Sequence, residues 1–80
     1  MSEDQAKRIN AARTVLDNVF NELVDAMAKH PPMHSAHEGY AVTLEELDEV
    51  WDAVKKDDLV HAKKEMKQVA AMAVRFLVDL

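Results

Sequence analysis

Two acidic segments of the sequence have the residue types and spacing of a divalent-cation site. Residues 45–49 read Glu-Glu-Leu-Asp-Glu, and residues 65–68 read Glu-Met-Lys-Gln. Side chains three residues apart on a helix project from nearly the same face, so Glu46 accompanies Glu49, and Glu65 accompanies Gln68. Several oxygen ligands converging on one point bind hard cations such as Mg²⁺. If the two segments lie on adjacent antiparallel helices, the sequence predicts such a site between them.

Helical projection at about 100° per residue separates these acids by their expected burial. Glu65 falls between Met72 and Phe76, inside the apolar arc of its helix, where a carboxylate is costly unless a partner or a metal compensates it. A buried ion pair with a lysine or arginine is the alternative interpretation. Glu46 borders the apolar arc of its own helix, and Glu49 projects further outward. The remaining acids of that helix fit a solvated face, namely Glu38, Glu45, Asp48 and Asp52.

The elements that must position these residues are helices. A single glycine and abundant Ala, Glu, Lys, Leu and Met predict an all-α protein. Ser2 and Gln5 form a capping-box pattern, which predicts a first helix over residues 3–29. Pro31 and Pro32 end it, because proline lacks an amide hydrogen and disfavours helix in the residue before it.

Two further helices follow, over about residues 35–56 and 58–80. Ser35 with Glu38 predicts the start of the second helix, although Thr43 with Glu46 offers a later start. Asp57 or Asp58 caps the third helix. The connection between these two helices is very short, which predicts antiparallel neighbours.

The chain is expected to form one domain that is completed by copies of itself. It has 80 residues, no cysteine and 49% hydrophobic residues, and a single core of this size is seldom stable without a staple. The third helix is apolar over more than half its circumference, which one neighbour inside the chain does not cover. We therefore expect a three-helix antiparallel bundle that assembles into a homodimer or homotetramer. The apolar residues of the third helix are Leu59, Met66, Val69, Ala70, Met72, Ala73, Val74, Phe76, Leu77 and Leu80.

Charge and hydropathy limit the classes of partner that the protein is expected to bind. The net charge of −5 argues against nucleic-acid binding, which requires a basic face. The sequence contains no run of 18 apolar residues and no apolar signal-peptide core in its first thirty residues, so we expect no membrane partner and a cytoplasmic location.

The acidic segments resemble those of the all-α nucleotide pyrophosphohydrolases of the MazG group. In that family E-E-x-x-E is followed, a dozen or more residues later, by E-x-x-D. Residues 37–41 through Trp51, and residues 69–73, also resemble small phage and bacterial members. The resemblance covers roughly residues 10–80, and residues 1–80 are expected to form a single MazG-like domain.

The resemblance implies cleavage of a nucleoside triphosphate between its α and β phosphates, giving a monophosphate and pyrophosphate. It implies a Mg²⁺ cofactor, with Mn²⁺ as a possible substitute. Carried over by position, the metal ligands are Glu46, Glu49, Glu65 and Gln68, while Glu45 and Glu49 are the candidate catalytic residues.

The sequence departs from the family pattern in two respects. Gln68 stands where the family has aspartate, which removes one negative charge from the site. The family often has a fourth helix, whereas three are predicted here. The alternative function is therefore a non-catalytic helical oligomerisation or interaction module.

Three more residues are candidates for substrate binding. His61 lies one turn before Glu65 on the same side of its helix, where it contacts either the substrate or its own helix start. Arg75, beside the wide apolar stripe, is a candidate phosphate clamp. Trp51 lies on an apolar arc, so it either stacks on a base or packs in a core or interface.

Overall fold

A computed structural model of the protein describes residues 1–80 and contains three helices and no strands. The helices are α1 (Glu3–Lys29), α2 (Ala36–Lys55) and α3 (Leu59–Asp79). The all-α class is confirmed, and each predicted boundary agrees to within one residue. No helix combines the length and the apolar character needed to cross a membrane.

The predicted caps account for the starts of α1 and α2. Ser2 and Gln5 exchange both hydrogen bonds of a capping box, with Gln5 N donating to Ser2 Oγ at 3.1 Å and Ser2 N donating to Gln5 Oε1 at 2.8 Å. The hydroxyl of Ser35 accepts from Glu38 N at 3.1 Å. The alternative start near Thr43 is wrong, because Thr43 lies inside α2 and donates its hydroxyl hydrogen to Gly39 O at 2.7 Å.

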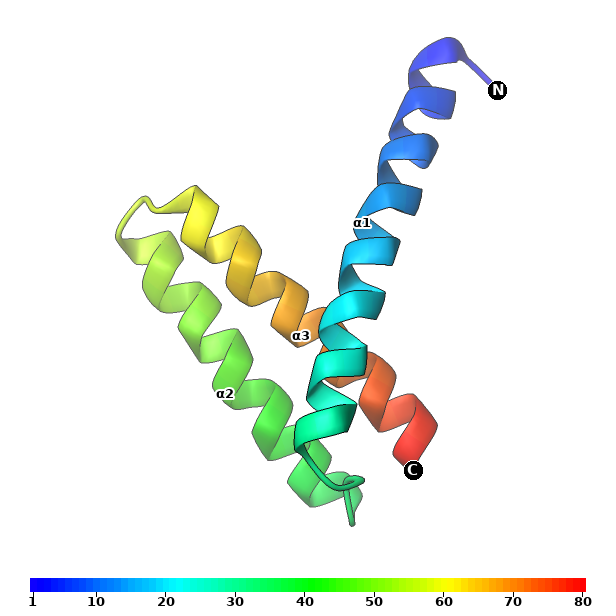
Figure 1. Cartoon of the computed structure of the whole chain (residues 1–80). Coiled ribbons are helices and arrows are strands. Elements are labelled where there is room, and N and C mark those ends of the chain that lie inside the picture. Colours follow the sequence, from blue (N-terminus) through cyan, green and yellow to red (C-terminus); the bar gives the residue numbers. More distant parts are fainter.

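A tight turn of residues 56–58 joins α2 to α3. Asp57 has a φ of 57°, the left-handed conformation that closes many helix C-termini and that aspartate tolerates better than most residues. Asp58 is the residue that caps α3, since its carboxylate accepts from His61 N at 3.0 Å. The two helices consequently lie side by side and run in opposite directions (Figure 1).

Helix α1 packs differently from the expected bundle. It crosses the C-terminal half of α3 and makes no close backbone approach to α2. Its N-terminal half projects away from the other helices (Figure 1), and only Val19 and Leu23 of α1 are buried. A closed three-helix bundle is therefore not seen within one chain.

The small core lies where α1, α3 and the α1–α2 connection meet. Leu23, Met33, Ala71 and Met72 form its buried centre. Helix α2 approaches α3 at Gly39, where an added Cβ would lie 2.6 Å from Phe76 Cδ2 and 3.1 Å from Met33 Sδ. Glycine at position 39 therefore permits this approach.

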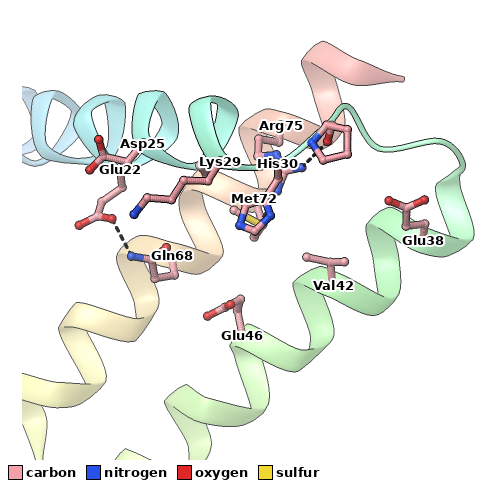
Figure 2. Close-up of a pocket in the computed structure, with 12 residues that line it drawn as sticks. Glu22, Asp25, Lys29, His30, Glu38, Val42, Glu46, Gln68, Met72 and Arg75 are labelled. Atoms are coloured by element: carbon pink, nitrogen blue, oxygen red, sulfur yellow. Dashed lines mark hydrogen bonds between the residues drawn. The ribbon is translucent and has the colours of Figure 1, made fainter.

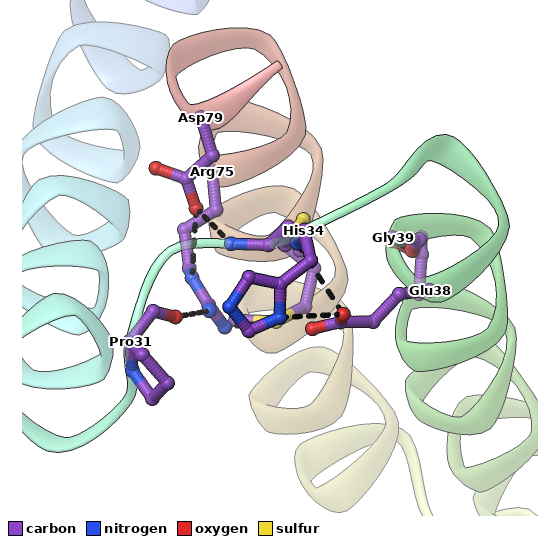
Figure 3. A network of polar contacts seen from close by, with 9 residues as sticks. Pro31, His34, Glu38, Gly39, Arg75 and Asp79 are labelled. Atoms are coloured by element: carbon purple, nitrogen blue, oxygen red, sulfur yellow. Dashed lines mark hydrogen bonds and ion pairs between the residues drawn. The ribbon is translucent and has the colours of Figure 1, made fainter.

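A polar network fastens the α1–α2 connection to α3 (Figure 3). Arg75 Nη2 donates to Pro31 O at 3.2 Å, and Arg75 Nε lies 3.9 Å from Asp79 Oδ2. The same Asp79 oxygen accepts from Met33 N at 3.0 Å. The Arg75 side chain is only 7% exposed. Asp79 lies within ion-pair distance of it, but the buried Nε atom of Arg75 has no hydrogen-bond partner.

Much of the apolar surface of the chain stays exposed. On α1, Val19 and Leu23 are buried, whereas Leu16 is 66% and Phe20 61% exposed. Helices α2 and α3 expose further apolar side chains, including Tyr40, Leu47, Trp51, Leu59, Met66 and Leu77. A single chain therefore leaves many large apolar side chains exposed to solvent.

Candidate functional site

Three carboxylates converge between α2 and α3. Glu46 and Glu49 project from successive turns of α2, and Glu65 projects from the facing turn of α3. One carboxylate oxygen from each residue lies within 4.8 Å of the other two. The antiparallel α2–α3 hairpin thus brings together three of the four residues that the sequence suggested as metal ligands; we call them the carboxylate cluster.

The negative charges of the carboxylate cluster repel one another. Burial and the neighbouring charges of Glu49 and Glu65 raise the pKa of Glu46 above its ordinary value. A hydrogen bond shared with Glu49, together with burial and the Glu49 charge, raises the pKa of Glu65, while His61 and Lys64 lower it. Like charges brought this close favour protonation or a counter-ion.

Glu65 has no cationic partner of the type that the alternative interpretation required. Its side chain is 16% exposed, and its ion-pair neighbour is His61, whose Nε2 lies 3.4 Å from Glu65 Oε1. Neither a lysine nor an arginine forms a salt bridge with it. His61 is therefore the only residue within ion-pair distance of Glu65, while the charge of Lys64 acts on Glu65 from further away.

The three carboxylates are the residues of this site that could hold a divalent cation. Mg²⁺ binds oxygen at about 2.0–2.1 Å in octahedral geometry, which places ligand oxygens about 2.9 Å apart in cis and about 4.2 Å apart in trans. The upper limit of 4.8 Å between the cluster oxygens is slightly wider than this. The three oxygens would therefore have to move closer together to share one such ion.

Gln68, the fourth residue suggested as a metal ligand, is hydrogen-bonded to α1 and is not part of the carboxylate cluster. Its amide Nε2 donates to Glu22 Oε2 on α1 at 2.6 Å, as Figure 2 shows. The sequence interpretation assigned no role to Glu22. A signal for it does exist, because Glu22 lies three residues after Val19 and directly before Leu23, at the border of the buried stripe of α1.

A cavity of about 430 Å³ opens on one side of the carboxylate cluster. It lies between the C-terminal half of α1, the start of α2 and the middle of α3 (Figure 2), and Glu46, Glu22 and Gln68 line it. We call it the α1 cavity. Its other lining residues are Asp25, Ala26, Lys29, His30, Pro31, Glu38, Val42, Met72 and Arg75.

A second cavity of about 370 Å³ opens beside the α2–α3 turn. Glu49 and Glu65 line it, together with Lys56 and His61. We call it the turn cavity. Its other lining residues are Asp52, Ala53 and Asp58. The carboxylate cluster therefore contributes side chains to two cavities.

The remaining candidate residues occupy varied positions. His61 lines the turn cavity. Arg75 lines the α1 cavity but is already bound to Pro31 and Met72. Trp51 is 59% exposed and lines neither cavity, and Lys55 Nζ lies 5.8 Å from its ring centroid.

Glu45 is exposed and lies outside both the cluster and the cavities. Of the two candidate catalytic residues, Glu49 alone is thus part of the cluster.

Comparison of the chain with protein-family models, with curated proteins and with solved structures finds no match. The function proposed for the chain therefore rests on its own residues.

Proposed function

We propose that the chain is a MazG-like nucleotide pyrophosphohydrolase that uses Mg²⁺, or Mn²⁺ in its place, to convert a nucleoside triphosphate into a monophosphate and pyrophosphate. The observation that supports this most directly is the convergence of Glu46, Glu49 and Glu65 within 4.8 Å. Two helices supply these acids in the order that resembles the MazG motifs. A cytoplasmic location accords with a nucleotide substrate.

In this proposal Glu46, Glu49 and Glu65 hold the cation. The cation would neutralise phosphate charge and orient the reacting groups. A water oxygen forms a bond to one phosphorus of the α–β anhydride, and the bridging oxygen leaves with the other phosphate group. The water gives up one proton to a carboxylate base. Glu49 is the better base of the two candidates, because it belongs to the cluster whereas Glu45 lies outside it.

Gln68 takes a modified role in the proposal. Its amide nitrogen is held by Glu22 at 2.6 Å, so only its carbonyl oxygen is free to face a cation. We assign Gln68 to the α1 cavity, with coordination of the ion left to the three carboxylates.

We also propose that the chain functions as a homodimer or homotetramer. The N-terminal half of α1 projects with Leu16 and Phe20 more than half exposed, and a helix without tertiary packing is only marginally stable in water. Packing against α1 or α2 of a second copy would complete the helical bundle that one chain leaves open.

A pyrophosphate-release assay over the common nucleoside triphosphates, with Mg²⁺ or Mn²⁺, tests the enzymatic proposal. Glu65→Gln should reduce release by about 100-fold or more, the usual scale for losing a group that positions transition-state charge. Asp48→Asn is the matched control, because Asp48 is exposed and outside the cluster; its activity should equal that of the parent. Absence of release from every triphosphate would exclude the proposal.

The second candidate function is a non-catalytic interaction module, which the extent of exposed apolar surface favours. Thermal melting with and without millimolar Mg²⁺ and a non-hydrolysable nucleotide analogue separates the two. A ligand that binds only the folded form raises the melting temperature. A shift that Glu65→Gln removes supports the enzyme, and no shift in the parent protein supports the module.

A further inference from the structure

The carboxylate cluster divides the space on the α2–α3 hairpin into two cavities of different character. Glu46 lines the α1 cavity, whereas Glu49 and Glu65 line the turn cavity. If a substrate anhydride lies at the cluster, its two halves can extend into different cavities. This step rests on the hydrolase function proposed above and concerns the direction in which the substrate lies.

The α1 cavity has the composition expected for a nucleoside. Ala26, Val42 and Met72 supply an apolar lining, and the Glu22–Gln68 pair supplies hydrogen-bonding groups beside it. A nucleoside has an apolar ring face with polar edges. Small-molecule sites of this size commonly combine apolar walls with a few convergent polar groups.

The turn cavity suits a group made only of phosphate. Its single hydrophobic residue is Ala53, and beside its four carboxylates it offers the Lys56 ammonium group and the His61 imidazole. Lys56 forms no ion pair within the chain, so its ammonium group is free for a phosphate.

The two other acids of the turn cavity already have partners. Asp52 pairs with Lys55 at 3.4 Å, and Asp58 caps α3 by accepting from His61 N. Lys56 therefore faces carboxylates that are either engaged in these contacts or part of the cation site.

We propose that the substrate lies across the carboxylate cluster with its nucleoside in the α1 cavity and its pyrophosphate end in the turn cavity. Lys56 and His61 bind the leaving pyrophosphate, and Met72 with the Glu22–Gln68 pair contacts the nucleoside. The two products therefore occupy separate sites after cleavage.

Separate titrations of the two products, in the presence of Mg²⁺, test this orientation. Calorimetry would measure the Kd of inorganic pyrophosphate and of each common nucleoside monophosphate. Lys56→Ala should raise the Kd of pyrophosphate about tenfold, the effect of losing one charge-assisted contact, and leave that of the monophosphate unchanged. Gln68→Phe, which places a ring in the α1 cavity, should raise the Kd of the monophosphate and leave that of pyrophosphate unchanged. Lys7→Ala, far out on α1, is the control for loss of a lysine and should alter neither Kd.

The outcomes distinguish the orientation from the proposed function. The parent protein could hydrolyse the triphosphate while Lys56→Ala weakens only monophosphate binding and Gln68→Phe weakens only pyrophosphate binding. That result would overturn the orientation and leave the proposed function standing. Equal effects of each variant on both products would show that one shared site binds them. Neither hydrolysis nor binding of either product by the parent protein would overturn both proposals. A melting curve of each variant shows that the folded form is being measured.

Discussion

The amide of Gln68 on α3 donates a 2.6 Å hydrogen bond to the carboxylate of Glu22 on α1, 46 residues earlier in the chain. The neutral amide at position 68 thus donates a hydrogen bond to the Glu22 carboxylate, which an aspartate at this position would repel. The bond also joins α1 to the hairpin that carries the carboxylate cluster. The side chain at position 68 therefore has a structural role in this fold, as the partner of Glu22.

Gln68→Asp should lower the stability of the cation-free protein by about 1–2 kcal/mol, because it replaces a donor with a second carboxylate facing Glu22. The added negative charge should also tighten Mg²⁺ binding. Thermal melts with EDTA and with a Mg²⁺ titration measure both effects. The double variant Gln68→Asp with Glu22→Gln should recover the cation-free stability. An unchanged response to Mg²⁺ would place position 68 outside the influence of the cation.

Glu65→Gln should stabilise the cation-free protein at neutral pH by about 1 kcal/mol, because it removes one of three clustered negative charges. Since the folded-state pKa values of Glu46 and Glu65 lie above the ordinary value of 4.5, the folded state binds these protons more tightly than the unfolded state. The tighter proton binding therefore stabilises the folded state below pH 4.5. This stabilisation is lost as the pH rises through the folded-state pKa values of Glu46 and Glu65.

The advantage of Glu65→Gln over the parent protein should therefore shrink as the pH falls from 7 toward 4.5. Urea unfolding at several pH values, with EDTA present, measures this difference. At pH 7, added Mg²⁺ should make the parent protein more stable than Glu65→Gln, because the ion stabilises only the parent protein. A pH-independent difference would mean that the three carboxylates do not interact.

Arg75→Leu should destabilise the protein by about 3 kcal/mol, because it leaves Asp79 partly buried without its cation and Pro31 O without its donor. Adding Asp79→Asn should restore part of the loss. Urea unfolding measures these energies. Activity per folded molecule should change little in Arg75→Leu. A large loss of activity in protein that remains fully folded would instead support Arg75 as a phosphate clamp.

Gly39→Ala should destabilise the protein by up to about 2 kcal/mol. Alanine gains about 1 kcal/mol of helix propensity over glycine, but its Cβ would lie 2.6 Å from Phe76 Cδ2, and such overpacking typically costs about 1–3 kcal/mol. Combining it with Phe76→Leu should relieve the clash and make Gly39→Ala less costly. Equal costs in both backgrounds would show that Phe76 is not the obstacle.

Phe20→Asp should convert the proposed homo-oligomer to a monomer, because the 61% exposed ring would be buried between copies and a charge there is costly. Light scattering after size-exclusion chromatography measures the mass. Asn21→Asp adds the same kind of charge at an exposed neighbouring position and should leave the assembly intact. A parent protein that is already monomeric at high concentration would contradict the oligomer.

Local signals in the sequence are sufficient to determine the three helices, because caps and helix ends depend on residues only a few positions apart. Ser2, Ser35 and Asp58 each bond a backbone amide three residues later. The short turn at residues 56–58 likewise requires α2 and α3 to be antiparallel. The meeting of Glu46 and Glu49 with Glu65 follows from helical spacing once that hairpin exists.

Tertiary structure alone decided where α1 lies and which residues it brings to the site. The Gln68–Glu22 bond joins residues 46 apart, and the Arg75–Pro31 bond joins residues 44 apart. Helical periodicity identifies which face of each helix is apolar, but it does not specify which segment of another helix covers that face. That choice depends on how side chains such as Leu23, Met33 and Met72 fit together in three dimensions.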